Sequence, residues 1–254
     1  MNDAPLLSAV VSVHNEEAQL AQCLERLTFA DEIVVLLDKC SDGSKKIAEE
    51  YAGRIVEGTW PKEGARRNAG IEACRGKWIL EVDADERVPI PLAGEIRMTG
   101  ENSSHDWHEI LVDNYVGEKL VRWGWGASFG KAAYPGLFRN GVKIWGDQRV
   151  HPSLSWSGRK GAMLANRLEH YVDRDISDMI KRLDAYSTAR ALDLREAGET
   201  WGSTANNVRR FFTRFYKCYV SRRGYREGGY GLLIALFAGL YPLLSHLKAK
   251  LEDG

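Results

Sequence analysis

Three apolar runs of strand length constrain the fold of this chain more than any other feature. They cover residues 7–13, 32–37 and 78–82, are rich in Val, Ile and Leu, and alternate with segments of helical spacing at 18–27 and 42–53. Near-continuous apolar strands of this kind are typical of a parallel sheet that helices bury on both faces. The sequence therefore predicts an α/β fold with βαβ units and a Rossmann-like sheet.

Each of the three runs ends in polar or acidic residues. The first is followed by HNEE at 14–17, the second by Asp38, and the third by Asp83 and Asp85. Open α/β sheets bind their ligands at the carboxyl ends of the strands. We therefore expect these side chains to form one binding site rather than scattered surface charge.

The closely spaced pair Asp83 and Asp85 is suited to a hard divalent cation, which would neutralise the phosphates of a nucleotide. An isolated pair can instead be a capping or solvated turn, but the apolar strand before it and Arg87 after it favour a site. An EF-hand is excluded, because DADERVPIPLAG lacks the required glycine and oxygen ligands at the right offsets. A phosphatase with an aspartyl nucleophile remains a minor alternative.

Composition limits the compartment and the partners. The 254 residues have a formal net charge of zero, so overall charge does not favour nucleic acid as a partner. The 4 cysteines are far apart and form no zinc-binding pattern, which indicates reduced thiols in the cytosol. The first residues, MNDAPLLSAVVSVHNEE, lack the basic region and cleavage site of a secretory signal.

The chain resembles family 2 glycosyltransferases of the GT-A fold in three motifs, which occur in the family's order and spacing. These are VVSVHNEEAQLAQCLERL, ADEIVVLLDKCSDGSKKIAEEYA and KEGARRNAGIEACRGKWILEVDADERV. Within the family, the chain looks most like enzymes that add a sugar, typically glucose, to the inner core of lipopolysaccharide. The later FRNGVKIWGDQRVHPSL and SRRGYREGGYGLLIALFAGLYPLL add to that likeness.

The resemblance implies a role for several of the strand-end residues in nucleotide-sugar binding. Glu16 and Asp38 would contact the ribose and base, and Arg67 would lie near the base or the phosphates. Asp83 would face the ribose or the metal. Asp85 would then hold the Mg²⁺ or Mn²⁺ that bridges the diphosphate.

His170 matches a histidine that this subgroup tends to carry, and it would complete the metal site or touch the diphosphate. A bound cation stabilises the departing diphosphate without a proton donor. Inversion at the sugar then needs only one general base for the acceptor hydroxyl.

The general base is where the chain departs from the pattern. An acid is expected directly after the histidine of a His-Glu pair, but RVHPSL has Pro152 there. The nearest substitute is Asp147, with Asp113 and Glu109 behind it. His151 itself could serve as the base or as a phosphate ligand. Asp147 can also be read as a turn cap, and Pro152 leaves open a non-catalytic nucleotide-sugar-binding or membrane-binding homologue.

The pattern divides the chain into three parts. Residues 1–100 are expected to form the nucleotide-sugar-binding half of a GT-A domain, and 101–170 the acceptor-side half, with irregular strands and a loop at 122–131. Residues 171–254 are expected to form a helical extension, because helical spacing returns at 173–198 and 206–220. One or two acceptor contacts are expected among the tryptophans of the middle part, Trp107, Trp123, Trp125, Trp145 and Trp156.

The extension contains a basic, aromatic segment at 206–226 that has no acid. Such a segment suits an anionic membrane surface, although RNA binding or a solvated helix face are alternatives. The apolar stretch at 232–244 is interrupted by Pro242 and is shorter than the roughly 20 residues that cross a bilayer. We expect it to lie on or dip into a bilayer, or to pack as a buried helix.

Together, the residues and the resemblance predict an inverting, metal-dependent glycosyltransferase on the cytoplasmic face of the inner membrane. It would move a hexose, glucose from UDP-glucose, to a lipopolysaccharide core or another lipid-linked glycan. The alternative donors are UDP-N-acetylglucosamine and GDP-mannose.

Overall fold

The computed structural model describes residues 4–126, 129–197 and 202–252. The chain divides into two compact units. The first comprises 1–112, 133–148 and 152–170, and the second comprises 113–132, 149–151 and 171–254.

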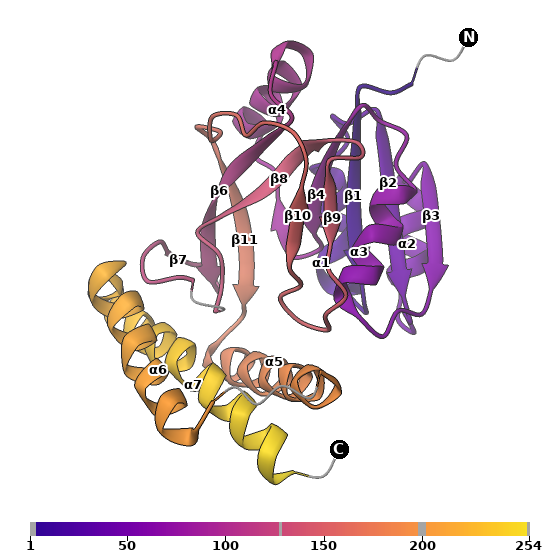
Figure 1. Ribbon diagram of the computed structural model, residues 1–254. Helices are drawn as coiled ribbons and strands as arrows, with labels where there is room; N and C mark the ends of the chain where they lie inside the picture. Colours follow the sequence, from indigo (N-terminus) through magenta and orange to yellow (C-terminus); the bar gives the residue numbers. More distant parts are fainter. Residues whose placement is uncertain (1–3, 127–128, 198–201, 253–254) are drawn as a thin grey trace. The chain divides into compact units, whose positions relative to one another are not determined.

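The first unit is built on four parallel strands in the order β3, β2, β1, β4 (Figure 1). Their bounds are β1 Leu7–Val13, β2 Glu32–Asp38, β3 Arg54–Gly58 and β4 Trp78–Asp83. The three predicted strands are confirmed, and β1, β2 and β4 are buried almost throughout. The edge strand β3 was not predicted, because it is only half-buried and two of its five residues are charged.

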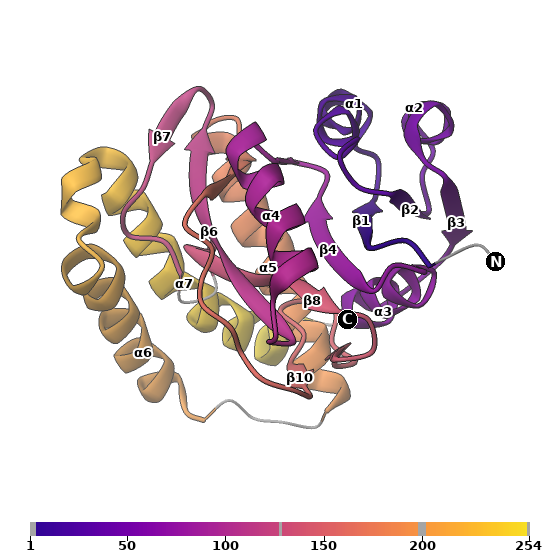
Figure 2. The ribbon, with the colours of Figure 1, turned by 90° about the horizontal axis from the view of Figure 1, so that it is seen from above.

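Helices cover both faces of this sheet, as predicted (Figure 2). The helices are α1 Glu17–Glu25, α2 Ser44–Tyr51, α3 Glu63–Glu72 and α4 Ile90–Asn102. Apolar residues of α1, α2 and α4 share one core cluster with alternate residues of the strands, such as Val11 and Val35. Ile71 of α3 packs on the other face against Val10 and Val34. The alternation of side chains along each strand thus supplies both cores.

Antiparallel strands extend the sheet beyond β4, and they occupy the part predicted to hold irregular strands. They are β5 Glu86–Arg87, β6 Trp107–Val116, β7 Lys119–Val121, β8 Ala133–Arg139 and β11 Arg167–Asp173, with a separate hairpin of β9 Lys143–Trp145 and β10 Leu154–Trp156. Strand β8 pairs with both β4 and β6. The short β5 pairs with β11, which sets His170 opposite Glu86.

The second unit is mostly helical. It contains α5 Ile176–Glu196, α6 Thr204–Tyr216, a π-helical turn at Lys217–Ser221, a 3₁₀ turn at Gly224–Glu227 and α7 Gly229–Leu251. The side chains of Asp175 and Ser203 cap α5 and α6, so each helix begins where a polar oxygen accepts a free backbone N–H. The helices predicted at 173–198 and 206–220 are confirmed where the structure describes them.

The expected interruption at Pro242 is wrong, because α7 is one helix of 23 residues that contains this proline. Pro242 itself is buried. Its missing hydrogen bond is offset by the packing of α7 on α5 and α6. The helix is therefore long and apolar enough to cross a membrane, although 56% of its apolar window is buried inside the protein, as in the core helix of a soluble protein.

Candidate active site

The loops that follow β1 and β2 are held together by short polar contacts. Asn15 and Lys39 adopt the left-handed backbone region, with φ of 56° and 52°. The Asn15 Oδ1 accepts the Ser41 N–H at 2.8 Å, and a Glu17 carboxylate oxygen accepts the Gly43 N–H at 2.6 Å. Such non-glycine strain persists where surrounding contacts enforce it, and it is frequent at functional sites. The two strand ends therefore form one structured rim.

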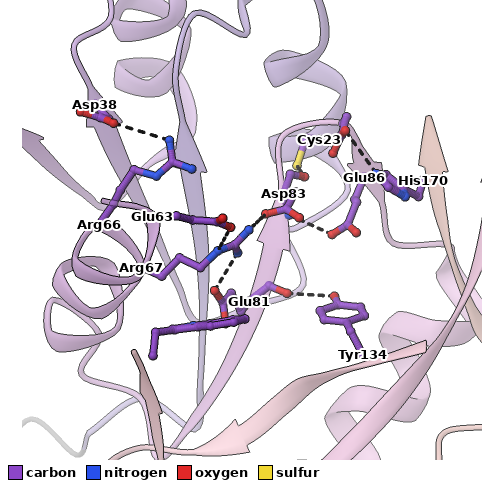
Figure 3. A network of polar contacts seen from close by, with 12 residues as sticks. Cys23, Asp38, Glu63, Arg66, Arg67, Glu81, Asp83, Glu86, Tyr134 and His170 are labelled. Carbon is purple, nitrogen blue, oxygen red and sulfur yellow. Dashed lines mark hydrogen bonds and ion pairs between the residues drawn. The ribbon is translucent and has the colours of Figure 1, made fainter. Parts of the chain in front are cut away.

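Asp38 lies at the end of β2 and is 7% exposed. Its Oδ1 accepts the Trp60 N–H at 3.0 Å, and its Oδ2 lies 3.6 Å from Arg66 Nη1 (Figure 3). The Asp38 backbone carbonyl contacts His14 Nδ1 at 2.6 Å. These contacts fix the carboxylate at the sheet edge where the other strand-end acids lie.

Arg67 of α3 binds three carboxylates (Figure 3). Its Nε donates to Glu63 at 2.8 Å, its Nη1 donates to Glu81 at 2.8 Å, and its Nη2 lies 3.0 Å from Asp83 Oδ1. Burial alone would lower the pKa of Arg67, but the charges of Asp83, Glu63 and Glu81 raise it well above its ordinary value. The guanidinium is thus engaged with protein carboxylates and orients Asp83.

Glu81 is a buried acid within the apolar strand β4. Its second oxygen accepts Lys143 Nζ at 2.6 Å and Trp145 Nε1 at 3.2 Å. Burial acts to raise the pKa of Glu81, but Lys143 and Arg67 outweigh it and lower that pKa. Lys143 is itself buried and lies 4.4 Å from the centre of the Trp145 ring. A chain of charges therefore runs from the β9–β10 hairpin through β4 to Asp83.

The structure brings Asp85 and His170 together, although 84 residues separate them in the sequence. His170 Nε2 lies 3.2 Å from Asp85 Oδ2. The other oxygen of Asp85 is buried and has no hydrogen-bond partner among the described residues. Glu86 Oε2 accepts the Asp83 N–H at 2.8 Å and so fixes the turn between the two aspartates. An orphaned buried carboxylate oxygen beside a histidine fits a cation ligand.

This pair fits a shared metal site rather than a complete protein cage. The described residues contain no group of three or more His, Cys, Asp or Glu side chains arranged to hold a metal ion. Mg²⁺ commonly takes one or two carboxylates and completes its shell with waters and substrate phosphates. Asp85 and His170 can therefore supply two ligands to such an ion, with the rest of its shell left to water and substrate.

Glu16 belongs to the same acidic site. Burial, and next the charges of Asp85, Asp83 and Asp42, raise its pKa from 4.5 to about 7. Its carboxylate thus lies close enough to both aspartates to be repelled by them. Acids from the ends of β1 and β4 converge at one edge of the sheet.

The candidate bases lie in different surroundings. Asp147 Oδ2 forms an ion pair with Lys62 Nζ at 2.6 Å, and the side chain is 69% exposed. Its loop lies against the start of α3, because the Gly64 N–H donates to the Gln148 carbonyl at 3.3 Å.

His151 belongs to the second unit, where its ring contacts Tyr186 and Tyr241 edge-on. Of the two further candidates for the base, Asp113 forms an ion pair with Arg122 and Glu109 forms one with Lys160, each at 2.8 Å.

Sequence reasoning missed the charged residues that support the site: Lys62, Glu63, Arg66, Glu81 and Lys143. Glu81 could have been recognised from the sequence, because a lone acid inside a buried apolar strand requires a buried cation as partner. The predicted loop at 122–131 lies partly outside the described residues. Of the five tryptophans, Trp125 is buried in the core, whereas Trp145 bonds to Glu81.

Comparisons with known proteins agree with this geometry. Residues 8–94 match the family model described as Glycosyl transferase family 2. The lipopolysaccharide core biosynthesis glycosyltransferase LpsC of Rhizobium meliloti (strain 1021) is 25% identical over 260 residues, which are 95% of this chain and 91% of that protein. EpsH of Bacillus subtilis (strain 168) is 31% identical over 125 residues, but the match spans only 46% of this chain and 35% of EpsH.

Among solved structures, residues 1–349 of TarS from S. aureus in complex with UDP-GlcNAc superpose with a TM-score of 0.54. The superposition covers 93% of this chain and 81% of that chain, at 12% sequence identity. At this identity the likeness concerns the fold alone, and it confirms the predicted GT-A architecture.

Proposed function

We propose that this chain transfers a hexose with inversion in a metal-dependent reaction. The premise is that it is a glycosyltransferase with a family 2 domain at residues 8–94. The observation that supports this most is the orphaned Asp85 oxygen beside His170. It lies in a site where Glu16 and Asp83 add further negative charge. Such a site favours a divalent cation and, through it, a nucleotide diphosphate.

Asp85 and His170 would hold the Mg²⁺ or Mn²⁺, which supplies positive charge to the departing diphosphate. Glu16 and Asp38 would accept hydrogen bonds from the ribose and base at the ends of β1 and β2. Asp83 would meet the ribose or the metal side, in the orientation that Arg67 gives it. In this proposal, Arg67 acts near the nucleotide through Asp83.

Asp147 is our first candidate for the general base. Its Oδ2 would take the proton of the acceptor hydroxyl as that oxygen attacks the sugar from the face opposite the diphosphate. The ion pair with Lys62 restricts the carboxylate to a few orientations, which favours a near-attack arrangement. His151 is the second candidate, with its ring nitrogen as the acceptor of the same proton.

The donor we propose is UDP-glucose, with UDP-N-acetylglucosamine and GDP-mannose as alternatives. TarS was crystallised with UDP-GlcNAc, and its sequence identity is too low to choose the sugar. The acceptor we propose is a lipopolysaccharide core or another lipid-linked glycan, supported by the full-length similarity to LpsC. Such an acceptor places the enzyme at the cytoplasmic face of the inner membrane.

Calorimetric titration with UDP, GDP, CMP and their sugar conjugates, with and without Mn²⁺, tests the donor and the metal together. We expect one nucleoside diphosphate to bind only with the metal, and Asp85→Asn to abolish this metal dependence. Asp184→Asn is the matched control, because Asp184 is an exposed aspartate of α5. Unchanged Mn²⁺-dependent binding in Asp85→Asn would remove Asp85 from the metal site.

A sugar-transfer assay separates the two candidate bases. Asp147→Asn and His151→Gln are compared in the presence of saturating donor. We expect Asp147→Asn to lower kcat by about 10²- to 10⁴-fold, the usual contribution of general base catalysis. Activity that survives in Asp147→Asn and is lost in His151→Gln would assign the base to His151.

A further inference from the structure

Helix α6 has an apolar stripe on its solvent-exposed side. The stripe consists of Val208, Phe212, Tyr216 and Val220, which recur every four residues through α6 and the π-helical turn. Their exposed fractions are 40%, 64%, 63% and 43%. Four large apolar side chains in one row are an uncommon surface for a protein that faces only water.

The opposite side of α6 is already occupied. It packs along α7 (Figure 1). The fit is tight at Gly239, where an added Cβ would lie 2.8 Å from the Phe211 ring. Phe215 and Cys218 belong to the core of the second unit. The helix therefore has two apolar sides, and the core of its own unit covers only one of them.

Cations accompany the exposed stripe. Arg209 and Lys217 are exposed on α6 and at its end. Arg223 and Arg226 follow, with their guanidinium groups 5.5 Å and 5.4 Å from the centre of the Trp123 ring. Between residues 206 and 226 there are seven Arg and Lys residues and no acid. The surface is thus apolar along its middle and positive along its borders.

We propose that the α6 stripe and its flanking cations bind the surface of an anionic lipid bilayer. An amphipathic helix of this kind lies in the interface, with apolar side chains among the upper acyl chains and cations at the anionic headgroups. A second copy of this chain is disfavoured as the occupant, because two such faces would repel each other. RNA would satisfy the cations but would leave the apolar row without a partner.

The proposal deepens the proposed function, since a lipid-linked acceptor lies at such a surface, but its test needs no sugar transfer. It also assigns α7 to the protein interior, where Ile234, Ala235 and Ala238 are fully buried. Binding would then be peripheral and reversible. A membrane-spanning α7 would instead make the attachment permanent.

Vesicle flotation tests the stripe directly. The purified full chain is mixed with vesicles of phosphatidylcholine alone, or with about a third phosphatidylglycerol added. We expect flotation only with the anionic vesicles. Phe212→Ser combined with Tyr216→Ser should weaken it about tenfold or more. Ile90→Ser combined with Met98→Ser is the matched control, because these α4 side chains are at least as exposed, at 78% and 66%.

The charges are tested with Arg209→Gln combined with Lys217→Gln. We expect about 30-fold weaker binding to anionic vesicles, because each basic residue near such a surface contributes about 1 kcal/mol. Exposed Arg26 and Lys46 provide the control pair, Arg26→Gln with Lys46→Gln. Circular dichroism and a thermal unfolding midpoint unchanged from wild type establish that each variant is folded.

Three results would overturn the proposal. The first is equal flotation of the stripe variant and the α4 control. The second is attachment that survives high salt and alkaline carbonate, which would indicate insertion of α7. The third is binding to RNA but not to anionic vesicles. Failure of the donor titrations would leave all of these readouts unaffected.

Discussion

Replacing Glu16 with glutamine should make the protein more stable at alkaline pH. The pKa of Glu16 is raised from 4.5 to about 7 by burial and by the charges of Asp85, Asp83 and Asp42. Above pH 7 the folded protein must keep this carboxylate ionised in an unfavourable place, whereas the unfolded chain ionises it freely. Glutamine keeps nearly the same shape and removes the charge.

The size and sign of the effect follow from linkage. A group whose pKa is raised by folding stabilises the protein fully below pH 4.5, and that contribution is lost as the pH rises to 7. At about 1.4 kcal/mol per pKa unit, the full difference approaches about 3 kcal/mol. Because Glu16 is only partly buried, water screens part of this electrostatic free energy. We therefore expect Glu16→Gln to raise the free energy of unfolding by about 1–2 kcal/mol at pH 8. At pH 4.5 the expected change is close to zero.

Denaturant unfolding of wild type and Glu16→Gln at pH 4.5 and pH 8 measures this difference. Glu50→Gln is the matched control, because Glu50 is an exposed carboxylate of α2. Added Mn²⁺ should stabilise the wild type at pH 8 and reduce the advantage of the variant, because a cation at Asp85 would offset the repulsion. A variant that is equally or less stable at pH 8, with no change between the two pH values, would refute the electrostatic reasoning.

Three further changes test other parts of the site. Lys143→Met should lower the free energy of unfolding by about 2–4 kcal/mol, because it leaves the buried Glu81 with one cation fewer. Denaturant unfolding measures this change, and a loss below about 1 kcal/mol would mean that Arg67 alone compensates the charge of Glu81. Gly64→Ala should destabilise the protein and impair sugar transfer, since a Cβ there would lie 1.6 Å from the Gly146 carbonyl oxygen; thermal unfolding and kcat unchanged from wild type would contradict this packing. Lys62→Met should lower kcat more than it raises the KM for the donor, and a change confined to that KM would show that Lys62 serves donor binding instead.

The sequence was sufficient to predict the strands that carry the acids. Residues 7–13 and 78–82 are apolar enough to be recognised as buried strands, and both were found within one residue of their bounds. Helix α3 was not predicted, because Gly64 and Gly70 lower its intrinsic helix propensity. These glycines permit close packing, since a Cβ at Gly70 would lie 3.0 Å from Val10.

The site itself required tertiary information. The contact between Asp85 and His170 depends on the pairing of β5 with β11, and β5 has only two residues. No local pattern predicts so short a strand, and only the resemblance to a family linked the two residues. The continuation of α7 through Pro242 was missed for a similar reason, because the packing of neighbouring helices outweighs the local cost of proline.

Helix α3 connects two parts of the first unit that carry acidic side chains. Its first turn supports the loop of Asp147 through Gly64, and its Arg67 holds Asp83 one turn later. The backbone of α3 therefore links the loop that carries Asp147 to the carboxylate of Asp83. In the proposed mechanism, substitutions within α3 would alter the distance between the proposed base and the metal side of the site, whereas substitutions of exposed side chains in the loop would alter which acceptor fits.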